Sequence, residues 1–203
     1  MADPGTSRPA AGTDRREAGR ATSRAGGASL DRAANLFGAL SLAVANQASD
    51  AVAEAAGRSG TAAAALSALL HFLDRPSVDL LRRVLGLTSS GTVRLLDRLA
   101  ESGYVERGQG ADGRSVSVTL TEEGRLAAQR VTDARAAVLS GALAVLSPAE
   151  REVFERLAGK VLVGMMRGPG AVRWICRLCD ISVCRGADGG CPAGNTASDR
   201  YLA

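Results

Sequence analysis

The feature that most constrains the fold of this chain is a pair of short helical segments that meet at Gly86. Ser77 can cap the first segment, and Gly86 can end it because glycine readily adopts the left-handed conformation of a helix C-terminus. Thr88 or Ser89 can cap the second segment, which runs to about Ser102. Two short helices joined by so tight a turn predict a helix-turn-helix, in which the second helix enters the major groove of DNA.

A β-hairpin is predicted directly after the second helix. Residues 104–107 and 115–120 are β-prone and alternate in polarity, whereas the stretch between them is rich in glycine and contains the turn dipeptide Asp112-Gly113. The hairpin loop carries Arg114 near its tip. A hairpin at this place is the wing of a winged helix-turn-helix, so the predicted fold class is mainly α with a small β-hairpin wing.

Further helices are predicted on both sides of this unit. Residues 30–57 repeat apolar side chains at spacings of three and four, and residues 125–167 hold two more helical stretches. The last one opens with Ser147 and Glu150 in the order of a capping box. The chain therefore divides into residues 1–29, which lack large apolar side chains and are expected to be disordered, residues 30–167, and a cysteine-bearing tail at residues 168–203.

Charge and composition limit the partners without identifying them. The net charge is +4, and nearly every basic residue is arginine, which suits phosphates and guanine edges but also fits an ordinary protein. No apolar run is long enough to span a membrane and no signal peptide is recognisable, so we expect a cytoplasmic protein without a membrane partner. There is no nucleophile–base set, phosphate-binding loop or dinucleotide fingerprint, so we do not expect an enzyme.

Four runs of the sequence together resemble the MarR family of transcription regulators: LGLTSSGTVRLLDRL at 85–99, GYVER at 103–107, DGR at 112–114 and LTEEG at 120–124. The resemblance implies a MarR-like dimeric architecture, in which paired winged helices of a homodimer read a pseudo-palindrome in double-stranded DNA. It further implies a DNA-binding core at residues 61–124 and dimerisation helices at residues 30–57 and 125–167.

The second helix of the helix-turn-helix carries the candidate DNA contacts. If Val93, Leu96 and Ala100 face the core, then Arg94 and Arg98 point away from it, toward base edges or phosphates. Hydroxyls in the first turns can position a phosphate together with the backbone N–H groups of the helix start. These hydroxyls belong to Thr88, Ser89, Ser90 and Thr92.

Three further residues are expected to serve the wing. Arg114 resembles the family's wing arginine, which reaches the minor groove, and Asp112 resembles the partner that steadies the loop tip. Asp97 is anionic and cannot contact a phosphate, so we expect it to pair with a nearby arginine and hold helix and wing together.

All four cysteines of the chain lie in the tail, with the spacing C-x2-C-x4-C-x6-C-P. In a reducing compartment such a set favours metal or redox chemistry over structural disulfides. Four thiolates can hold zinc or an iron–sulfur cluster, and unmetallated redox thiols are a third possibility. The only histidine, His71, is interpreted as a residue at the edge of the core. The candidate ligands are Cys176, Cys179, Cys184 and Cys191.

The sequence thus predicts a DNA-binding regulator, expected to be a repressor, that senses redox or metal state through its tail. In the alternative, the effector is a small organic molecule in the dimer cleft and the tail binds a structural zinc. A winged helix that binds only proteins would show no salt-dependent affinity for DNA, which separates it from both hypotheses.

Overall fold

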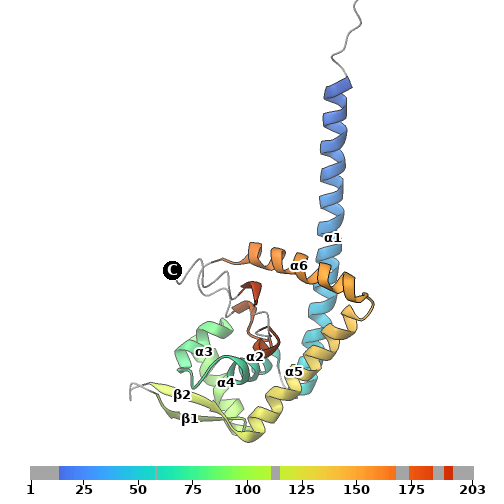
Figure 1. Cartoon of the computed structure of the whole chain (residues 1–203). Helices are drawn as coiled ribbons and strands as arrows, with labels where there is room; N and C mark the ends of the chain where they lie inside the picture. Colours follow the sequence, from blue (N-terminus) through green and yellow to red (C-terminus); the bar gives the residue numbers. More distant parts are fainter. Residues whose placement is uncertain (1–13, 58, 111–114, 168–173, 185–189, 194–203) are drawn as a thin grey trace, which may run out of the picture. The chain divides into compact units, whose positions relative to one another are not determined.

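The computed structural model describes residues 14–57, 59–110, 115–167, 174–184 and 190–193 (Figure 1). Its internal contacts divide the chain into two units, residues 1–45 and residues 46–203. Among the described residues, no helix is both long and apolar enough to cross a membrane.

The first unit is helical where it is described. Helix α1 (Asp14–Ala56) has 43 residues and continues into the second unit. Residues 1–13 lie outside the described part, and residues 14–29, which the sequence led us to expect as disordered, form the first turns of this helix. The physical reason is composition: alanine, arginine and glutamate are good helix formers, and extending an existing helix avoids the cost of nucleation.

Helix α2 (Gly60–His71) lies at the centre of the second unit, where its residues from Ala62 to Leu69 are all buried. It packs most extensively against α5 (Glu122–Leu143). The fold class predicted from the sequence is confirmed, because the described elements are helices and one two-stranded sheet. The other elements are α3 (Val78–Leu85), α4 (Ser89–Glu101), β1 (Val105–Gln109), β2 (Val116–Leu120), α6 (Pro148–Met165) and α8 (Ile181–Cys184).

Local caps explain why these helices begin and end where they do. The Ser77 hydroxyl accepts a hydrogen bond from the Leu80 N–H at 3.2 Å, and the chain leaves α3 through Gly86 at φ +65°. The Thr88 hydroxyl accepts from the Gly91 N–H at 3.1 Å, so α4 starts at Ser89. Each cap satisfies an N–H or carbonyl that has no partner within its own helix.

The hairpin is antiparallel, with Val105 opposite Leu120 and Gln109 opposite Val116. It is tied to the start of α3, since the Val118 N–H donates to the Pro76 carbonyl at 3.0 Å. The inward-facing residues of the strands join the core beneath α2, α3 and α4, whose largest fully buried side chains include Leu66, Leu81, Leu95, Leu99 and Val118. The second helix of the helix-turn-helix and the hairpin therefore rest on one hydrophobic core.

The buried face of α4 differs from the one expected from the sequence. Leu95, Leu96 and Leu99 are buried, whereas Val93 is 48% exposed and Ala100 is also exposed. The prediction that Val93 and Ala100 face the core is wrong. Three leucines bury more apolar area than one valine and one alanine, so the helix turns its leucine face inward.

Helix α6 has no buried residue within the part of the chain that the structure describes. Its exposed apolar side chains recur at helical spacing and form one stripe, which we call the α6 stripe. Large exposed apolar patches of this kind are typical of surfaces that bind other proteins. The α6 stripe consists of Val153, Phe154, Leu157, Val161 and Met165.

Candidate nucleic-acid interface

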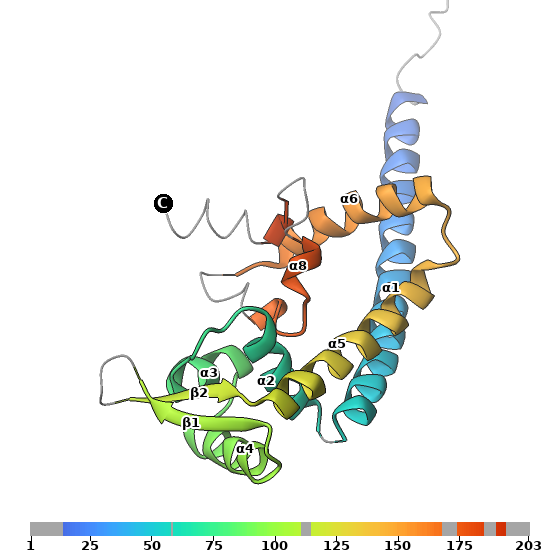
Figure 2. The ribbon, with the colours of Figure 1, turned by 60° about the horizontal axis from the view of Figure 1, so that its bottom comes forward.

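Helix α4 presents a polar face away from the core, beside the hairpin (Figure 2). Ser89 and Ser90 lie exposed in its first turn, and Arg94 and Arg98 are exposed further along. Within the described residues neither guanidinium has an ion-pair partner. Two unpaired cations and two hydroxyls on one side of a helix form a surface that can bind an anion such as a phosphate.

Thr92 does not belong to this surface, although the sequence suggested it as a DNA-contacting hydroxyl. Its side chain is fully buried, and its hydroxyl donates to the Thr88 carbonyl at 2.9 Å. A threonine bonded to the preceding turn has its hydroxyl committed within the helix, so it cannot reach a groove. Thr88 itself is exposed, but its hydroxyl caps α4 and so orients the helix start.

Val93 is a feature of this face that sequence reasoning missed. It lies next to Arg94 and is about half exposed. An apolar side chain on a groove-facing helix can pack on the methyl group of thymine. The signal that could have found it was the leucine spacing of α4, which leaves Val93 outside the buried stripe.

Asp97 connects α4 to the hairpin. Its Oδ1 lies 2.6 Å from the Nη2 of Arg107 on β1, and both side chains are partly exposed. The pair spans the gap between the helix and the first strand, so it restrains how the wing is held beside α4. The two other residues expected to serve the wing, Asp112 and Arg114, lie outside the described residues.

The cysteine segment, residues 174–184, is seated on the turn of the helix-turn-helix. A Cβ placed on Gly86 would lie 2.9 Å from Cζ3 of the Trp174 ring, which shows how closely the ring covers this glycine. The Arg177 guanidinium stacks 3.8 Å from the centre of the same ring. Leu178 packs against the core beneath α2. The segment is therefore anchored at its aromatic end and in its middle.

A series of polar side-chain contacts links the cysteine segment to α2 and α5. Oδ1 of Asp180 lies 3.6 Å from Nδ1 of His71 at the end of α2, and Nε2 of His71 lies 2.8 Å from the Thr132 hydroxyl on α5. The hydroxyl and the N–H of Ser182 both donate to Asp180 and, together, hold the pKa of this carboxyl below its usual value. His71 lies at the edge of the core, as expected from the sequence.

The four cysteines lie close together as two pairs. Cys176 and Cys179 share a side-chain hydrogen bond, and so do Cys184 and Cys191. The bond from Cys176, with help from the Arg135 and Arg177 charges, lowers the pKa of Cys179 to about 6, and the same bond raises the pKa of Cys176. Burial raises the pKa of Cys184. In the described part of the chain, no three Cys, His, Asp or Glu side chains are already arranged as a metal-binding group.

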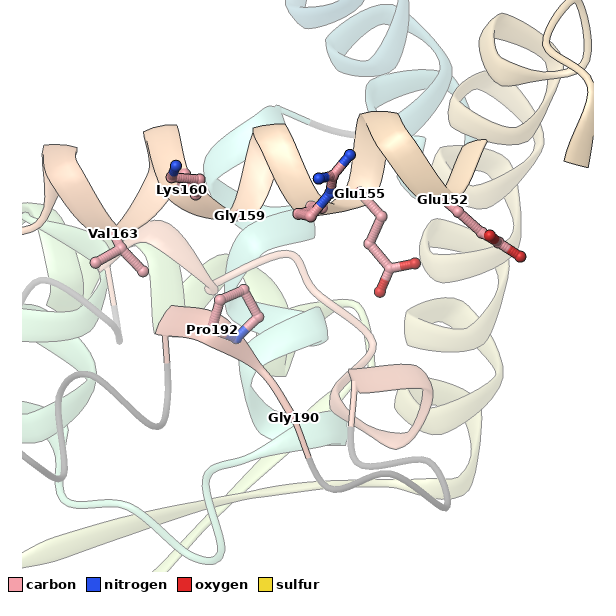
Figure 3. Close-up of a pocket in the computed structure, with 8 residues that line it drawn as sticks. Glu152, Glu155, Gly159, Lys160, Val163, Gly190 and Pro192 are labelled. Atoms are coloured by element: carbon pink, nitrogen blue, oxygen red, sulfur yellow. The ribbon is translucent and has the colours of Figure 1, made fainter. Parts of the chain in front are cut away.

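An open groove runs along α6 beside the end of the cysteine segment (Figure 3). Its volume is about 570 Å³, and its walls carry both acidic and basic side chains. Gly159 of α6 faces Pro192, because a Cβ added to this glycine would lie at the ordinary contact distance of 3.4 Å from the proline Cγ. The groove is lined by Glu152, Glu155, Arg156, Gly159, Lys160, Val163, Gly190 and Pro192.

Comparison with known proteins finds similarity to transcription regulators over part of this chain. Residues 56–115 match the model of the MarR family. An uncharacterized HTH-type transcriptional regulator of Bacillus subtilis, YwhA, is 32% identical over 84 residues, which are 41% of this chain and 60% of that relative. The chain thus matches less than two thirds of the length of this curated relative.

Solved structures share the fold. A MarR family protein from Bacillus stearothermophilus superposes with a TM-score of 0.60 at 24% identity, covering 68% of this chain and 96% of the other. MepR, a transcription regulator of a multidrug efflux pump in Staphylococcus aureus, gives 0.57 at 19% identity over 66% of this chain and 98% of its own. The chain therefore shares the winged-helix fold of these structures, and its residues 56–115 are similar to the MarR family.

Proposed function

We propose that this chain is a sequence-specific DNA-binding transcription regulator that acts as a homodimer and represses its targets. The observation that carries the proposal is the exposed face of α4. Arg94 and Arg98 have no ion-pair partner there among the described residues, and the face lies beside a hairpin that the Asp97–Arg107 pair restrains. A mutant of S. aureus MepR, which shares the fold at a TM-score of 0.50 and 20% identity over 66% of this chain and 97% of its own, has been solved bound to an oligodeoxyribonucleotide.

In this proposal the residues of α4 contact different parts of the DNA. Arg94 and Arg98 reach guanine edges or phosphates, because a guanidinium fork matches both. Ser89 and Ser90 bind a phosphate at the N-terminus of α4, where the backbone N–H groups point outward. Val93 contacts a thymine methyl, and Arg114 enters the neighbouring minor groove.

Two exposed apolar surfaces support a homodimer. The α6 stripe has no cover within the described residues, and α1 exposes large apolar side chains in its own unit. A two-fold dimer buries the same patch of both subunits and sets the distance between their two recognition helices. The apolar residues of α1 are Leu30, Leu36, Phe37, Leu40 and Leu42.

The experiment is selection of genomic fragments by the purified chain, followed by titration of the best fragment with R94A and R130A. Arg130 is exposed on α5, so R130A removes the same charge outside the interface. We expect R94A to cost about 1–3 kcal/mol of binding free energy and R130A to have little effect. Absence of any preferred fragment, at low and at moderate salt, would overturn the proposal.

A second candidate for the signal is a small organic effector, and the groove along α6 favours it. Its volume of about 570 Å³ falls in the usual range of ligand pockets, and Arg156 and Lys160 lie beside the apolar Val163 and Pro192. Arg156 and Lys160 offer positive charges to an amphipathic organic anion, and Glu152 and Glu155 line the same groove. Titration with the fluorescent anion 8-anilinonaphthalene-1-sulfonate should show saturable binding that K160A weakens, and equal binding by both chains would exclude the groove.

A further inference from the structure

We infer that Cys176, Cys179, Cys184 and Cys191 together hold a thiophilic metal centre, and that its binding stabilises the turn of the helix-turn-helix. The inference about the turn rests on the proposed function, whereas the metal site stands by itself. Its basis is the proximity of Cys191 to the three thiols of the cysteine segment, which contacts Gly86, α2 and α5.

The four thiols lie near one another as two pairs that have not closed on a common centre. The chain contains four cysteines, and all four lie in the same short stretch. Cys176 and Cys179 share one turn of backbone, with the Cys179 N–H donating to the Cys176 carbonyl at 2.8 Å. Cys184 ends α8 and shares a side-chain hydrogen bond with Cys191. Proteins usually assemble four thiolate ligands from two close pairs of cysteines.

The donor set selects the class of metal. Four sulfur ligands suit zinc in tetrahedral geometry or the four irons of an iron–sulfur cluster, whereas calcium and magnesium require oxygen ligands. The nearest carboxylate of the segment, Asp180, already accepts from Ser182 and lies beside His71, so it is not available as a ligand. Binding requires the two thiol pairs to close on a common centre, which would fix the backbone between them.

Fixing this backbone acts on the DNA-binding unit through three contacts. The Trp174 ring covers Gly86, the residue through which the chain leaves α3. Leu178 is packed in the core, and Asp180 is joined through His71 to α5. A centre that orders the segment therefore stabilises the arrangement of α3 and α4, and its loss releases the turn.

The first experiment measures the metal in the full chain purified without oxygen. We expect either about one zinc per chain and no colour, or iron and sulfide in equal amounts with visible charge-transfer absorption. C184S should reduce the metal content at least about tenfold. V183A is the matched control, since Val183 is the exposed neighbour of Cys184 and offers no ligand. Circular dichroism checks that both variants are folded.

A cobalt titration supplies an independent readout. The reduced metal-free chain should bind Co²⁺ with the intense absorption of tetrahedral thiolate coordination, and C184S should not. A chain that carries no metal and shows no such absorption, with all four thiols free to alkylation, would overturn the metal site.

The second experiment measures DNA affinity before and after metal removal. We expect removal to weaken binding about 5- to 150-fold, and W174A to reduce this dependence while it keeps the metal. Equal affinities with and without metal would overturn the coupling and leave the site intact. If the chain binds no DNA in either state, the proposed function fails and the metal content still decides the site.

Discussion

Replacing Gly86 with alanine tests directly whether the cysteine segment rests on the helix-turn-helix. Gly86 has a φ of +65°, a left-handed conformation that costs other residues about 1–2 kcal/mol. The new Cβ would lie 2.9 Å from Trp174 Cζ3, inside the ordinary carbon–carbon contact distance of about 3.5–4.0 Å. The ring must therefore move, and losing this partly exposed contact costs about 1–2 kcal/mol more. The expected total is about 2–4 kcal/mol of unfolding free energy.

Two controls separate the backbone strain from the lost ring contact. Gly57 has a φ of +58°, and a Cβ added there would have no atom within 4 Å, so G57A should cost the strain alone. G86A introduced into W174A should cost the same as G57A, because no ring remains to be displaced. Urea unfolding followed by circular dichroism measures each free energy. Trp174 is the only tryptophan, so its emission should shift to the red in G86A.

Equal costs of G86A in the wild-type and W174A chains, with unchanged tryptophan emission, would refute this reasoning. The ring would then not be seated on Gly86, and the metal site would have no direct route to the turn.

Three further predictions concern the described elements. D97A and R107A should each change the free energy of unfolding by less than about 1 kcal/mol, because the ion pair is partly exposed. D97A should nevertheless weaken DNA binding, because the wing is then less restrained beside α4. A DNA titration at several salt concentrations measures this effect. G124A should unfold the chain far more readily than G57A in the same urea assay, since a Cβ there would collide with the backbone leading into β1. The hydrogen bonds from Ser147 lower the pKa of Glu150, so its contribution to stability is present above its ordinary pKa and is lost as pH falls through the lowered value. E150Q should therefore show a smaller loss of thermal stability between about pH 6 and pH 3 than the wild type, measured by calorimetry.

Metal binding or oxidation at the cysteines would allow this winged helix to respond to a chemical signal. The exposed face of α4 does not provide such a response. The hydrogen bond from Cys176 lowers the pKa of Cys179 to about 6, and a lowered pKa makes a thiol of the metal-free chain more reactive toward a metal or an oxidant. Cys179 lies one position from Asp180, whose contact with His71 leads into α2.

The sequence by itself determined the order and the ends of the helices of the helix-turn-helix and the start of α6. Ser77, Gly86 and Thr88 specify the helix-turn-helix, and Ser147 with Glu150 specifies the start of α6. These signals are readable because a cap acts on backbone groups within a few residues of itself. The choice of glycine at a left-handed position is local in the same way.

Only the tertiary structure decided which side of α4 is buried and what the cysteine segment touches. Leu95 and Leu99 face the core, and Val93 is therefore exposed. Thr92 is buried, and its hydroxyl is hydrogen-bonded within α4, so it cannot reach a DNA groove. The contact of Trp174 with Gly86 joins residues far apart in the chain. Such contacts depend on how several helices and strands pack together, and a local pattern of residues does not specify that packing.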